Sequence, residues 1–414
     1  MTDSTHRTLD AVVRAEGSRV LATLVRTIGD LQLAEDAVQE AAIAALRTWP
    51  ATGIPDDPRA WLTVAARRKA VDVLRRESHR HGKEAAAMDL RSPGDEPVPD
   101  SVVRDDLLRL IFTCCHPALA QDAQVVLALR TLCGLSTAQI AAALLVPEPT
   151  MAKRLVRVKS KIERAGIPYR VPRAEELPQR LPGVLSVVYL IFTEGHRATS
   201  GEVLVRIDLC DEAVRLARLL VDLMPDEPEA MALLALLLFT DSRRDERVDV
   251  DGNLIPLAEQ DRRRWNQAAI EEATQVLDQS LRRTAGRAGP YQLQACLASC
   301  HARARSFEST PWPEIVRLYD VLDEVAPSPV VRLNRAIAVA EVAGPAVALR
   351  DLDALTGIAH VHLWHAARAE MLRRLGEREQ AARALESALQ GRLTDPERRL
   401  LVARLDELRT AGTA

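Results

Sequence analysis

Residues 135–162 read Leu-Ser-Thr-Ala-Gln-Ile-Ala-Ala-Ala-Leu-Leu-Val-Pro-Glu-Pro-Thr-Met-Ala-Lys-Arg-Leu-Val-Arg-Val-Lys-Ser-Lys-Ile, and this stretch decides the fold of its part of the chain. Ser136 and Gln139 have the spacing of a capping box, which predicts a helix that starts at Thr137. The Val-Pro-Glu-Pro run that ends at Pro149 forces a turn, and proline is tolerated at the first position of a new helix. The pattern predicts two helices joined by a short turn.

The second of these helices has one apolar face and one basic face. Its apolar stripe, at i, i+4, i+7 and i+11, consists of Met151, Leu155, Val158 and Ile162. The opposite face carries Lys153, Arg154, Arg157, Lys161 and Arg164. A cationic face on the second helix of a helix-turn-helix is how a recognition helix meets the major groove of DNA. The alternative is an ordinary helical hairpin with a basic surface.

A second helix with one cationic face is predicted from Ala60 to Glu77. Its apolar stripe consists of Leu62, Ala66, Ala70 and Val73, and its charged side of Arg68, Lys69, Asp72, Arg75 and Arg76. Trp61 falls on the charged side, where nucleic acid bases could stack on its ring while the cations neutralise phosphates. The alternative is a solvated amphipathic helix whose tryptophan packs on a neighbour.

The composition favours a helical, globular chain. The 414 residues are 47% hydrophobic, 27% charged and only 3% aromatic, with abundant Ala, Leu and Arg, which predicts an all-α fold of several domains. A net charge of −3 argues against a protein that coats nucleic acid or anionic membrane with its whole surface. The longest apolar run, Met231 to Phe239, is too short to cross a bilayer, and the polar stretch Met1-Thr-Asp-Ser-Thr-His lacks the apolar core of a signal peptide. We therefore expect a cytoplasmic protein with no membrane partner.

Proline and charge divide the chain into five parts. A linker is predicted over residues 78–100, where the composition cannot bury enough apolar area, and a second over residues 166–182, where four prolines interrupt any helix. These linkers separate domains over residues 1–77, 101–165 and 183–414.

The carboxy-terminal domain alternates helical segments with short turns. The expected helices are Leu209 to Leu223, Glu229 to Phe239, Trp265 to Leu281, Tyr291 to Arg305, Trp312 to Val325, Val330 to Val342, and a region from His362 to Gln390. The last region resembles one tetratricopeptide unit, with small Ala367, a turn at Leu375-Gly376, and then Ala382, Leu385 and Ala388. Stacked helical hairpins would explain the pattern; a plain helical bundle is the alternative.

Metal-binding and catalytic patterns are weak. Cys114-Cys115-His116 and Cys296 with Cys300-His301 contain zinc-ligand types without a second spaced pair, so the six cysteines are read as reduced core residues. The Asp249–Asn253 run is read as a tight acidic turn and not a calcium loop, because Ile255 and Leu257 replace oxygen ligands. Glu194-Gly195-His196 has no accompanying nucleophile, and no phosphate-loop, dinucleotide or hydrolase motif occurs. We expect no cofactor, no metal and no enzymatic activity.

Taken together, the two modules resemble an extracytoplasmic-function sigma factor, the minimal form of the bacterial sigma-70 family. Residues 30–41, Asp-Leu-Gln-Leu-Ala-Glu-Asp-Ala-Val-Gln-Glu-Ala, are similar to the region-2 helix that docks on the clamp of core RNA polymerase. Residues 57–76 are similar to the promoter-melting helix, and residues 134–155 to the region-4 helix-turn-helix. The turn departs from the family pattern, because Leu145 and Pro149 stand where small residues or glycine are common.

The resemblance implies roles for individual residues. The clamp of the polymerase would meet Asp36, Gln39 and Glu40, which share a polar side opposite Ala37, Val38, Ala41 and Ala45; a solvated face is the alternative. The minus-ten element and its opened strand would meet Trp61, Arg67, Arg68, Lys69, Arg75 and Arg76. The minus-thirty-five element would meet Thr150, Lys153, Arg154, Arg157 and Lys161, while region 4 contacts the polymerase flap.

The carboxy-terminal half distinguishes the chain from minimal sigma factors. Residues 185–196, 249–254 and 259–265 resemble the extension of a subgroup that ends in tetratricopeptide-like repeats, which is thought to regulate or assist activity. Its helical array would bind a protein partner or another part of the same chain. The resemblance implies a function in promoter recognition and melting with core RNA polymerase. The alternative function is a helix-turn-helix transcriptional regulator with a helical sensor domain.

Overall fold

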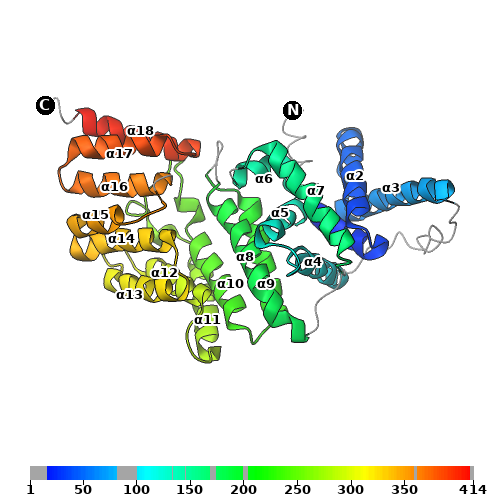
Figure 1. The fold of residues 1–414 in the computed structure, drawn as a ribbon, viewed down its shortest axis with the longest axis horizontal. Helices are drawn as coiled ribbons and strands as arrows, with labels where there is room; N and C mark the ends of the chain where they lie inside the picture. Colours follow the sequence, from blue (N-terminus) through cyan, green and yellow to red (C-terminus); the bar gives the residue numbers. More distant parts are fainter. Residues whose placement is uncertain are drawn as a thin grey trace. The chain divides into compact units, whose positions relative to one another are not determined.

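The protein is built from α-helices (Figure 1). The computed structural model describes residues 16–81, 100–132, 134–144, 146–167, 174–198, 204–358 and 361–410. Within these ranges the only β pairing is an isolated antiparallel bridge between Val248 and Leu254. The all-α prediction is confirmed. The chain forms two compact units that meet in sequence at Ile191 and Phe192.

The first unit begins with a bundle of three helices. They are a helix over residues 16–28, α2 (Leu31–Thr52) and α3 (Pro58–His81). The Asp30 side chain caps α2 by accepting a hydrogen bond of 3.0 Å from Leu33 N. The core between α2 and α3 is rich in small residues, Ala34, Ala37, Ala41, Ala45, Ala66 and Ala70, with Trp49 and Leu62. Small side chains let the two helix axes approach closely.

The second part of this unit contains four further helices. They are α4 (Asp100–Cys114), α5 (Gln121–Thr131), α6 (Thr137–Ala143) and α7 (Glu148–Arg164). Their shared core includes Leu107, Leu110, Ile111, Phe112, Leu127, Leu132 and Leu135, all with almost no exposed surface. At 11 to 17 residues, α5 and α7 can each bury a full apolar stripe, and the short α6 depends on both neighbours for its stability.

Two predicted boundaries differ from the structure. Helix α3 continues to His81, past the predicted domain end at residue 77, and residues 82–99 of that linker lie outside the described ranges. Helix α8 (Leu177–His196) starts inside the predicted linker over residues 166–182 and contains Pro182, so the expectation that proline ends every helix there was wrong. The buried stripe of Leu181, Val184, Leu185 and Val188 outweighs the one hydrogen bond that Pro182 cannot donate.

The second unit contains the last turn of α8 and a succession of helices, with a long irregular segment between α10 and α11 and mostly shorter connections elsewhere (Figure 1). They are α9 (Ile207–Leu223), α10 (Pro228–Asp241), α11 (Gln267–Arg283), α12 (Pro290–Arg303), α13 (Trp312–Val325), α14 (Pro329–Ala343), α15 (Pro345–Asp353), α16 (His362–Arg374), α17 (Arg378–Leu389) and α18 (Asp395–Thr410). Each helix from α12 to α18 packs on its neighbour in sequence, and α10 is buried between α9, α11 and α12. The seven predicted helical segments are confirmed, and two further helices of this unit, α15 and α18, were not predicted.

The tetratricopeptide-like segment forms the predicted hairpin. Helices α16 and α17 pack together, and Gly376 adopts a φ of +83° in the turn between them, a conformation that glycine accepts without steric cost. Leu385 and Ala388 are buried with Leu372, Leu401 and Leu405 in one cluster that also contains α18. The carboxy-terminal helices are therefore a stack of hairpins, each covering the apolar face of the previous one.

Candidate nucleic-acid interface

The helix-turn-helix is capped as the sequence predicts. Ser136 N donates a hydrogen bond of 2.9 Å to Gln139 Oε1, and Gln139 N donates one of 3.2 Å to Ser136 Oγ. This reciprocal pair satisfies two backbone donors at the start of α6 and confirms the helix start at Thr137. Helix α7 begins one residue earlier than predicted, at Glu148, so Pro149 occupies the second position, where its missing N–H still has no intrahelical acceptor.

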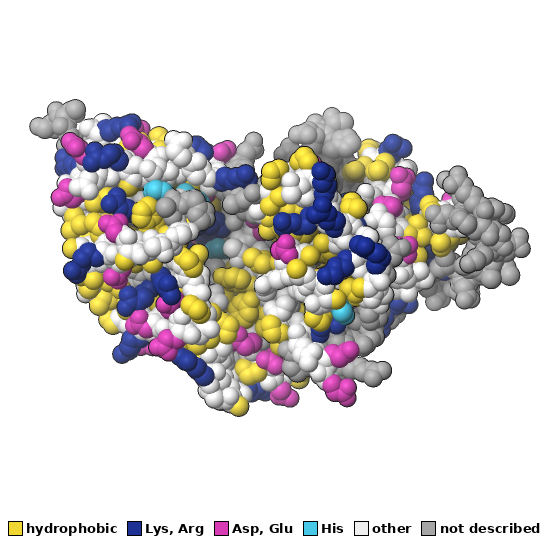
Figure 2. Space-filling view, viewed as in Figure 1, with side chains coloured by type: hydrophobic (Ala, Val, Ile, Leu, Met, Phe, Trp, Pro, Cys, Tyr) yellow, Lys and Arg dark blue, Asp and Glu magenta, His cyan; other side chains and the backbone are white. Residues whose placement is uncertain are grey.

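Helix α7 separates its apolar and basic sides clearly. All four predicted apolar residues are buried, from Met151 with no exposed surface to Ile162 with 9%. The predicted DNA-contacting side chains of Thr150, Lys153, Arg157 and Lys161 are exposed, and Figure 2 shows Lys and Arg side chains gathered over this helix. Arg154 differs from them, because it is half-buried and lies 3.5 Å from the Asp122 carboxylate of α5.

The cationic side of α3 is partly engaged by its own module. Arg68 and Lys69 are exposed, and Lys69 Nζ lies 3.8 Å from a carboxylate oxygen of Glu40 on α2. Arg67 and Arg75 are half-buried, while the side chain of Arg76 lies outside the described part of the structure. Asp72 on the same side is exposed as well, so the exposed positions of this face carry two cations and one carboxylate.

Trp61 is packed more closely than a solvent-exposed ring. Its ring meets the buried Trp49 ring edge to face, with centroids 5.3 Å apart at an interplanar angle of 68°. Such contacts stabilise aromatic pairs by about 0.5–1.5 kcal/mol beyond the buried area. Trp61 thus packs on a neighbour, as the alternative interpretation has it, and part of the residue is still left to solvent.

The predicted polymerase-facing side of α2 is exposed. Asp36, Gln39 and Glu40 all lie on the surface, opposite Ala37, Ala41 and Ala45, which are buried. The Asp36 carboxylate accepts hydrogen bonds of 3.0 and 3.1 Å from Gln32 Nε2, and Gln39 Nε2 donates one of 3.4 Å to Glu35. The side chains of Asp36 and Glu40 give this face an anionic character.

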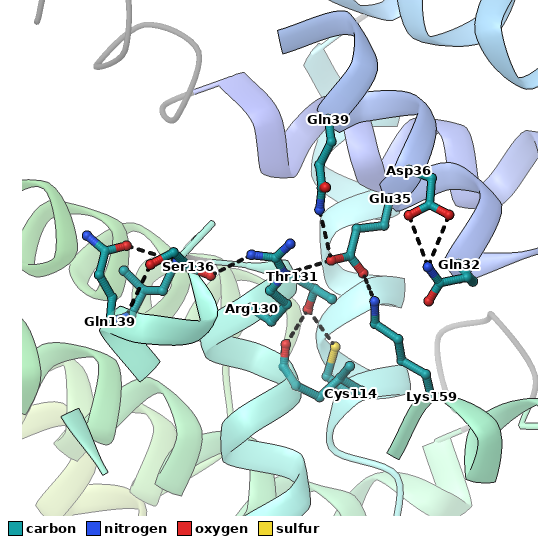
Figure 3. A network of polar contacts seen from close by, with 12 residues as sticks. Gln32, Glu35, Asp36, Gln39, Cys114, Arg130, Thr131, Ser136, Gln139 and Lys159 are labelled. Carbon is teal, nitrogen blue, oxygen red and sulfur yellow. Dashed lines mark hydrogen bonds and ion pairs between the residues drawn. The ribbon is translucent and has the colours of Figure 1, made fainter. Parts of the chain in front are cut away.

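Glu35 joins the two helical modules of the first unit, and the sequence analysis did not identify it (Figure 3). Its carboxylate is 7% exposed, accepts a hydrogen bond of 2.7 Å from Arg130 Nε, and lies 2.6 Å from Lys159 Nζ. Arg130 belongs to α5 and Lys159 to α7, and Arg130 also donates to Leu135 O at 3.0 Å. One buried carboxylate on α2 thus connects α2 both to α5 and to α7, the second helix of the helix-turn-helix.

A second buried carboxylate makes a similar connection. Asp106 of α4 has no exposed surface and accepts hydrogen bonds from Arg26 Nε at 2.9 Å and Arg109 at 3.2 Å. Arg26 belongs to the helix over residues 16–28, so this pair also links the two modules.

The sequence does contain a signal for Glu35. This residue lies four positions after Leu31 and three before Val38, so it falls on the same side of α2 as these two apolar residues.

Three cysteines, Cys114, Cys115 and Cys210, are core residues, whereas Cys296 and Cys300 are half-buried and Cys133 lies outside the described residues. Burial raises the pKa of Cys114 to about 12, although its Sγ contacts Thr131 Oγ1 at 3.1 Å. Burial likewise raises the pKa of Cys115 and brings that of Cys210 to about 12. Over the described ranges, no three His, Cys, Asp or Glu side chains come together as a metal site would require.

The Asp249–Asn253 segment forms a tight turn. Asp249 accepts hydrogen bonds from Asp251 N at 2.9 Å and from Asn253 N at 2.8 Å, and Arg399 of α18 donates to Gly252 O and Asn253 Oδ1. The Asp249 carboxylate is thus hydrogen-bonded within its own loop, which is the tight acidic turn that the sequence predicts.

Among the described residues, no helix is long and apolar enough to span a membrane.

Comparisons with known proteins agree with this two-module arrangement. The family described as Sigma-70 region 2 matches residues 12–80, and Sigma-70, region 4 matches residues 109–162. A family of unknown function, DUF6596, matches residues 180–281. The chain is 41% identical over 387 residues to the uncharacterized protein R00370 of Rhizobium meliloti (strain 1021), covering 92% of this chain and 91% of that protein.

The chain also resembles named sigma factors. It is 30% identical over 179 residues to the probable ECF RNA polymerase sigma factor SigI of Mycobacterium tuberculosis, in strains CDC 1551 and H37Rv, which covers 42% of this chain and 60% of SigI. The fold and the matched regions define a transcription initiation factor with two DNA-binding modules. The chain belongs to the extracytoplasmic-function sigma factors of the sigma-70 family and carries a carboxy-terminal extension.

Proposed function

We propose that the protein directs core RNA polymerase to a specific set of promoters and opens the DNA at the minus-ten element. The observation that carries this proposal is the pair of exposed cationic faces, one on α3 and one on α7, which belong to modules matched to regions 2 and 4. Two separate faces suit a factor that reads two separate promoter elements.

Helix α7 would lie in the major groove of the minus-thirty-five element. Thr150 and Lys153 lie in its first two turns, where recognition helices contact base edges, while Arg157 and Lys161 extend the cationic face toward the phosphates. Arg154 would contribute after exchanging its Asp122 partner for a phosphate. Because most of these contacts are to phosphates, affinity should fall steeply with salt.

Helix α3 would hold the minus-ten element and its opened strand. The exposed part of Trp61 offers a ring for base stacking, held in orientation by Trp49, and Arg67, Arg68, Lys69, Arg75 and Arg76 would track the backbone. A ring that is already fixed loses little conformational entropy when a base stacks on it.

Helix α2 would present Asp36, Gln39 and Glu40 to the clamp of core polymerase, and region 4 would contact the flap. The anionic character of Asp36 and Glu40 would suit a cationic partner surface and increase the association rate. No catalytic role is proposed for this chain, whose site of action with polymerase would be the cytoplasm. The extension would regulate or assist the first unit, by binding a protein partner or another part of the chain.

If both promoter elements are bound at the same time, the contacts of Glu35 between the two modules have to change. The minus-thirty-five and minus-ten elements lie about 25 base pairs apart, which corresponds to about 85 Å along the DNA at about 3.4 Å per base pair. The Glu35 carboxylate instead holds α2 against α5 and α7 by direct contacts of 2.6 and 2.7 Å. We therefore include in the proposal that these ion pairs break when the chain binds polymerase and promoter.

The test is run-off transcription with purified core polymerase on the DNA upstream of this protein's own gene. The full chain should confer a defined start site. The double variant K153E/R157E changes two exposed side chains of α7 and should abolish promoter-dependent transcripts while core binding is retained. The double variant D36K/E40K should lose core binding, and R303E/R305E, an equal change of charge on exposed residues of the second unit, should retain both activities.

Two results would contradict the proposal. One is equal loss of core affinity in K153E/R157E and D36K/E40K, because α7 would then contribute to polymerase binding as much as α2 does. The other is sequence-specific duplex binding by the chain alone with no start-site selection on polymerase, which would favour the helix-turn-helix regulator.

A further inference from the structure

The segment between α10 and α11 is anchored inside the second unit by buried arginines. Arg247, 7% exposed, donates a hydrogen bond to His196 O at the end of α8. Arg262, 5% exposed, donates to His301 O of α12 at 2.9 Å and to Thr310 Oγ1 at 3.0 Å. The two buried guanidinium groups thus belong to opposite ends of the irregular segment between α10 and α11.

Several arginines around this segment have carboxylate partners. Arg244 forms ion pairs with Asp211 and Asp241 at 2.7 and 2.6 Å. Arg264 pairs with the buried Glu246 at 3.0 Å, and Arg197 donates to Glu397 at 2.7 Å. These acids already have arginine partners, and of them Glu397 also acts on Arg247 through its charge.

Three arginines are left without such a partner. In the part of the chain that the structure describes, no carboxylate forms an ion pair with Arg243, Arg247 or Arg262. Arg243 is half-buried, and its side chain makes no hydrogen bond to any described residue. A buried charge without a counter-charge is costly, and native proteins seldom leave one unneutralised.

Two histidines beside these arginines have unpartnered nitrogens. His196 is 8% exposed, its ring stacks on Phe192, and neither ring nitrogen has a hydrogen-bond partner among the described residues. Within the same ranges, His301 Nδ1 and Arg262 Nε are also buried and unpaired. Buried polar atoms are normally satisfied, so several orphans in one place indicate a missing group with hydrogen-bonding atoms.

The pKa shifts of these groups agree with the hydrogen bonds that hold Arg247 beside His196 and Arg262 beside His301. Burial and then the charges of Arg243 and Arg197 lower the pKa of Arg247 to about 9, and burial with the charge of Arg262 lowers the pKa of Arg243 to about 10. Arg243 also lowers the pKa of both His196 and His301, after burial as the main cause. Arg243 is therefore close enough to act on both histidines and on both buried arginines.

We propose that Arg243, Arg247 and Arg262, with His196 and His301, form a binding site for a phosphate group. These three cations have no ion-pair partner and are opposed only by the more distant charges of Glu397 and Glu308, while Arg262 also lies 5.2 Å over the Trp265 ring. Three such cations favour a ligand with more than one negative charge, and the planar guanidinium fork matches phosphate oxygens in a bidentate manner. A bound phosphate would accept hydrogen bonds from the side chains that have none. The depth of Arg247 and Arg262 favours free phosphate or a small phosphorylated molecule over a macromolecular surface. The site lies in the extension and does not depend on the proposed promoter function.

The test uses the full chain without polymerase or DNA. Isothermal titration with inorganic phosphate and thermal unfolding in phosphate against chloride of equal ionic strength would be measured for the wild type, R243Q and R263Q. Phosphate should raise the unfolding midpoint of the wild type, and R243Q should weaken phosphate binding at least about tenfold. R263Q is the matched control, because Arg263 is 87% exposed in the same segment and should bind phosphate as the wild type does.

R243Q should fold, because the change removes a cation that has no partner; its midpoint without phosphate should equal or exceed that of the wild type. R243K, which keeps the charge and loses the fork, should bind with intermediate affinity. A sugar phosphate that binds more tightly than inorganic phosphate would assign the site to a phosphorylated small molecule, and equal or weaker binding would assign it to free phosphate. Equal effects of phosphate and chloride, or unchanged binding by R243Q, would overturn the proposal.

Discussion

Glu35 of α2 and Lys159 of α7 form an ion pair of 2.6 Å that connects the two modules of the first unit. The same carboxylate accepts a hydrogen bond from Arg130 of α5, and only 7% of the Glu35 side chain is exposed. Because two cations from different helices contact one buried carboxylate, the interaction is directional as well as electrostatic. It therefore fixes the relative position of the two modules. This relationship decides how regions 2 and 4 are held before they meet polymerase or DNA.

Replacing Glu35 by Gln should destabilise the first unit by about 1–3 kcal/mol, because Arg130 and Lys159 would keep their partly buried charges without a counter-charge. Urea denaturation followed by circular dichroism would measure the loss. Asp36→Asn is the matched control: Asp36 is exposed and bonded only to Gln32 among the described side chains, so its variant should stay within about 0.5 kcal/mol of the wild type. Equal stability of E35Q and wild type would show that the ion pairs contribute nothing net.

Removal of the Ser136 hydroxyl should weaken the helix-turn-helix. Ser136→Ala leaves Gln139 N without its cap and should cost about 0.5–2 kcal/mol, measured as faster amide hydrogen exchange in α6. Thr137→Ala, one residue later and outside the reciprocal pair, is the control and should leave exchange in α6 nearly unchanged. If both variants exchange alike, the capping box does not set the start of α6.

Much of the fold could be predicted because the local signals agree with one another. The capping box at Ser136, the apolar stripe of α7 and the bounds Trp312–Val325 of α13 follow from residues within one or two turns of each other. Helix α15 was missed because it has only nine residues and follows α14 after the single residue Gly344, and α18 was missed as well. Pro182 was overestimated as a helix breaker because tertiary burial of α8 is not visible in local sequence.

The candidate site was predicted less completely, for a different physical reason. The exposed cations of α7 share one helix face, so periodicity alone separates them from the core. Glu35 and Arg130 are 95 residues apart, and no local pattern brings them together. The arginine cluster of the second unit is similar, since Arg247 and Arg262 lie in an irregular segment where neither helical nor strand periodicity applies.

The stability of the second unit should fall in acid because of His301. Burial, with the charges of Arg243 and Arg262, lowers the pKa of His301 from its ordinary 6.5 to about 4. Below pH 6.5 the unfolded chain binds a proton that the folded protein does not, so stability is lost between pH 6.5 and 4, at up to about 1.4 kcal/mol per pH unit. His301→Gln cannot take up the proton and should show a smaller loss from pH 6.5 to 4.5 than the wild type.

The comparison is made on the slope, because His301 also meets the Trp312 ring edge to face, and the variant loses that contact at every pH. Denaturant midpoints at pH 8.0, 6.5, 5.5 and 4.5 would give both slopes. Between pH 8.0 and 6.5 the two proteins should show the same dependence on pH. Parallel curves down to pH 4.5 would mean that His301 takes up its proton as readily in the folded protein as in the unfolded chain.

Gly195 should not tolerate a side chain, although it lies in a helix where alanine is normally preferred by about 1 kcal/mol. A Cβ at this position would come within 2.7 Å of Cys210 N and 2.9 Å of the Leu209 Cβ, and backbone at the start of α9 cannot move aside cheaply. Gly195→Ala should therefore destabilise the protein by about 1–3 kcal/mol in urea. Gly17→Ala is the matched control, because nothing lies within 4 Å of its Cβ position and the change should be neutral or stabilising. If both substitutions stabilise the protein, α8 and α9 are not packed as closely as Gly195 allows.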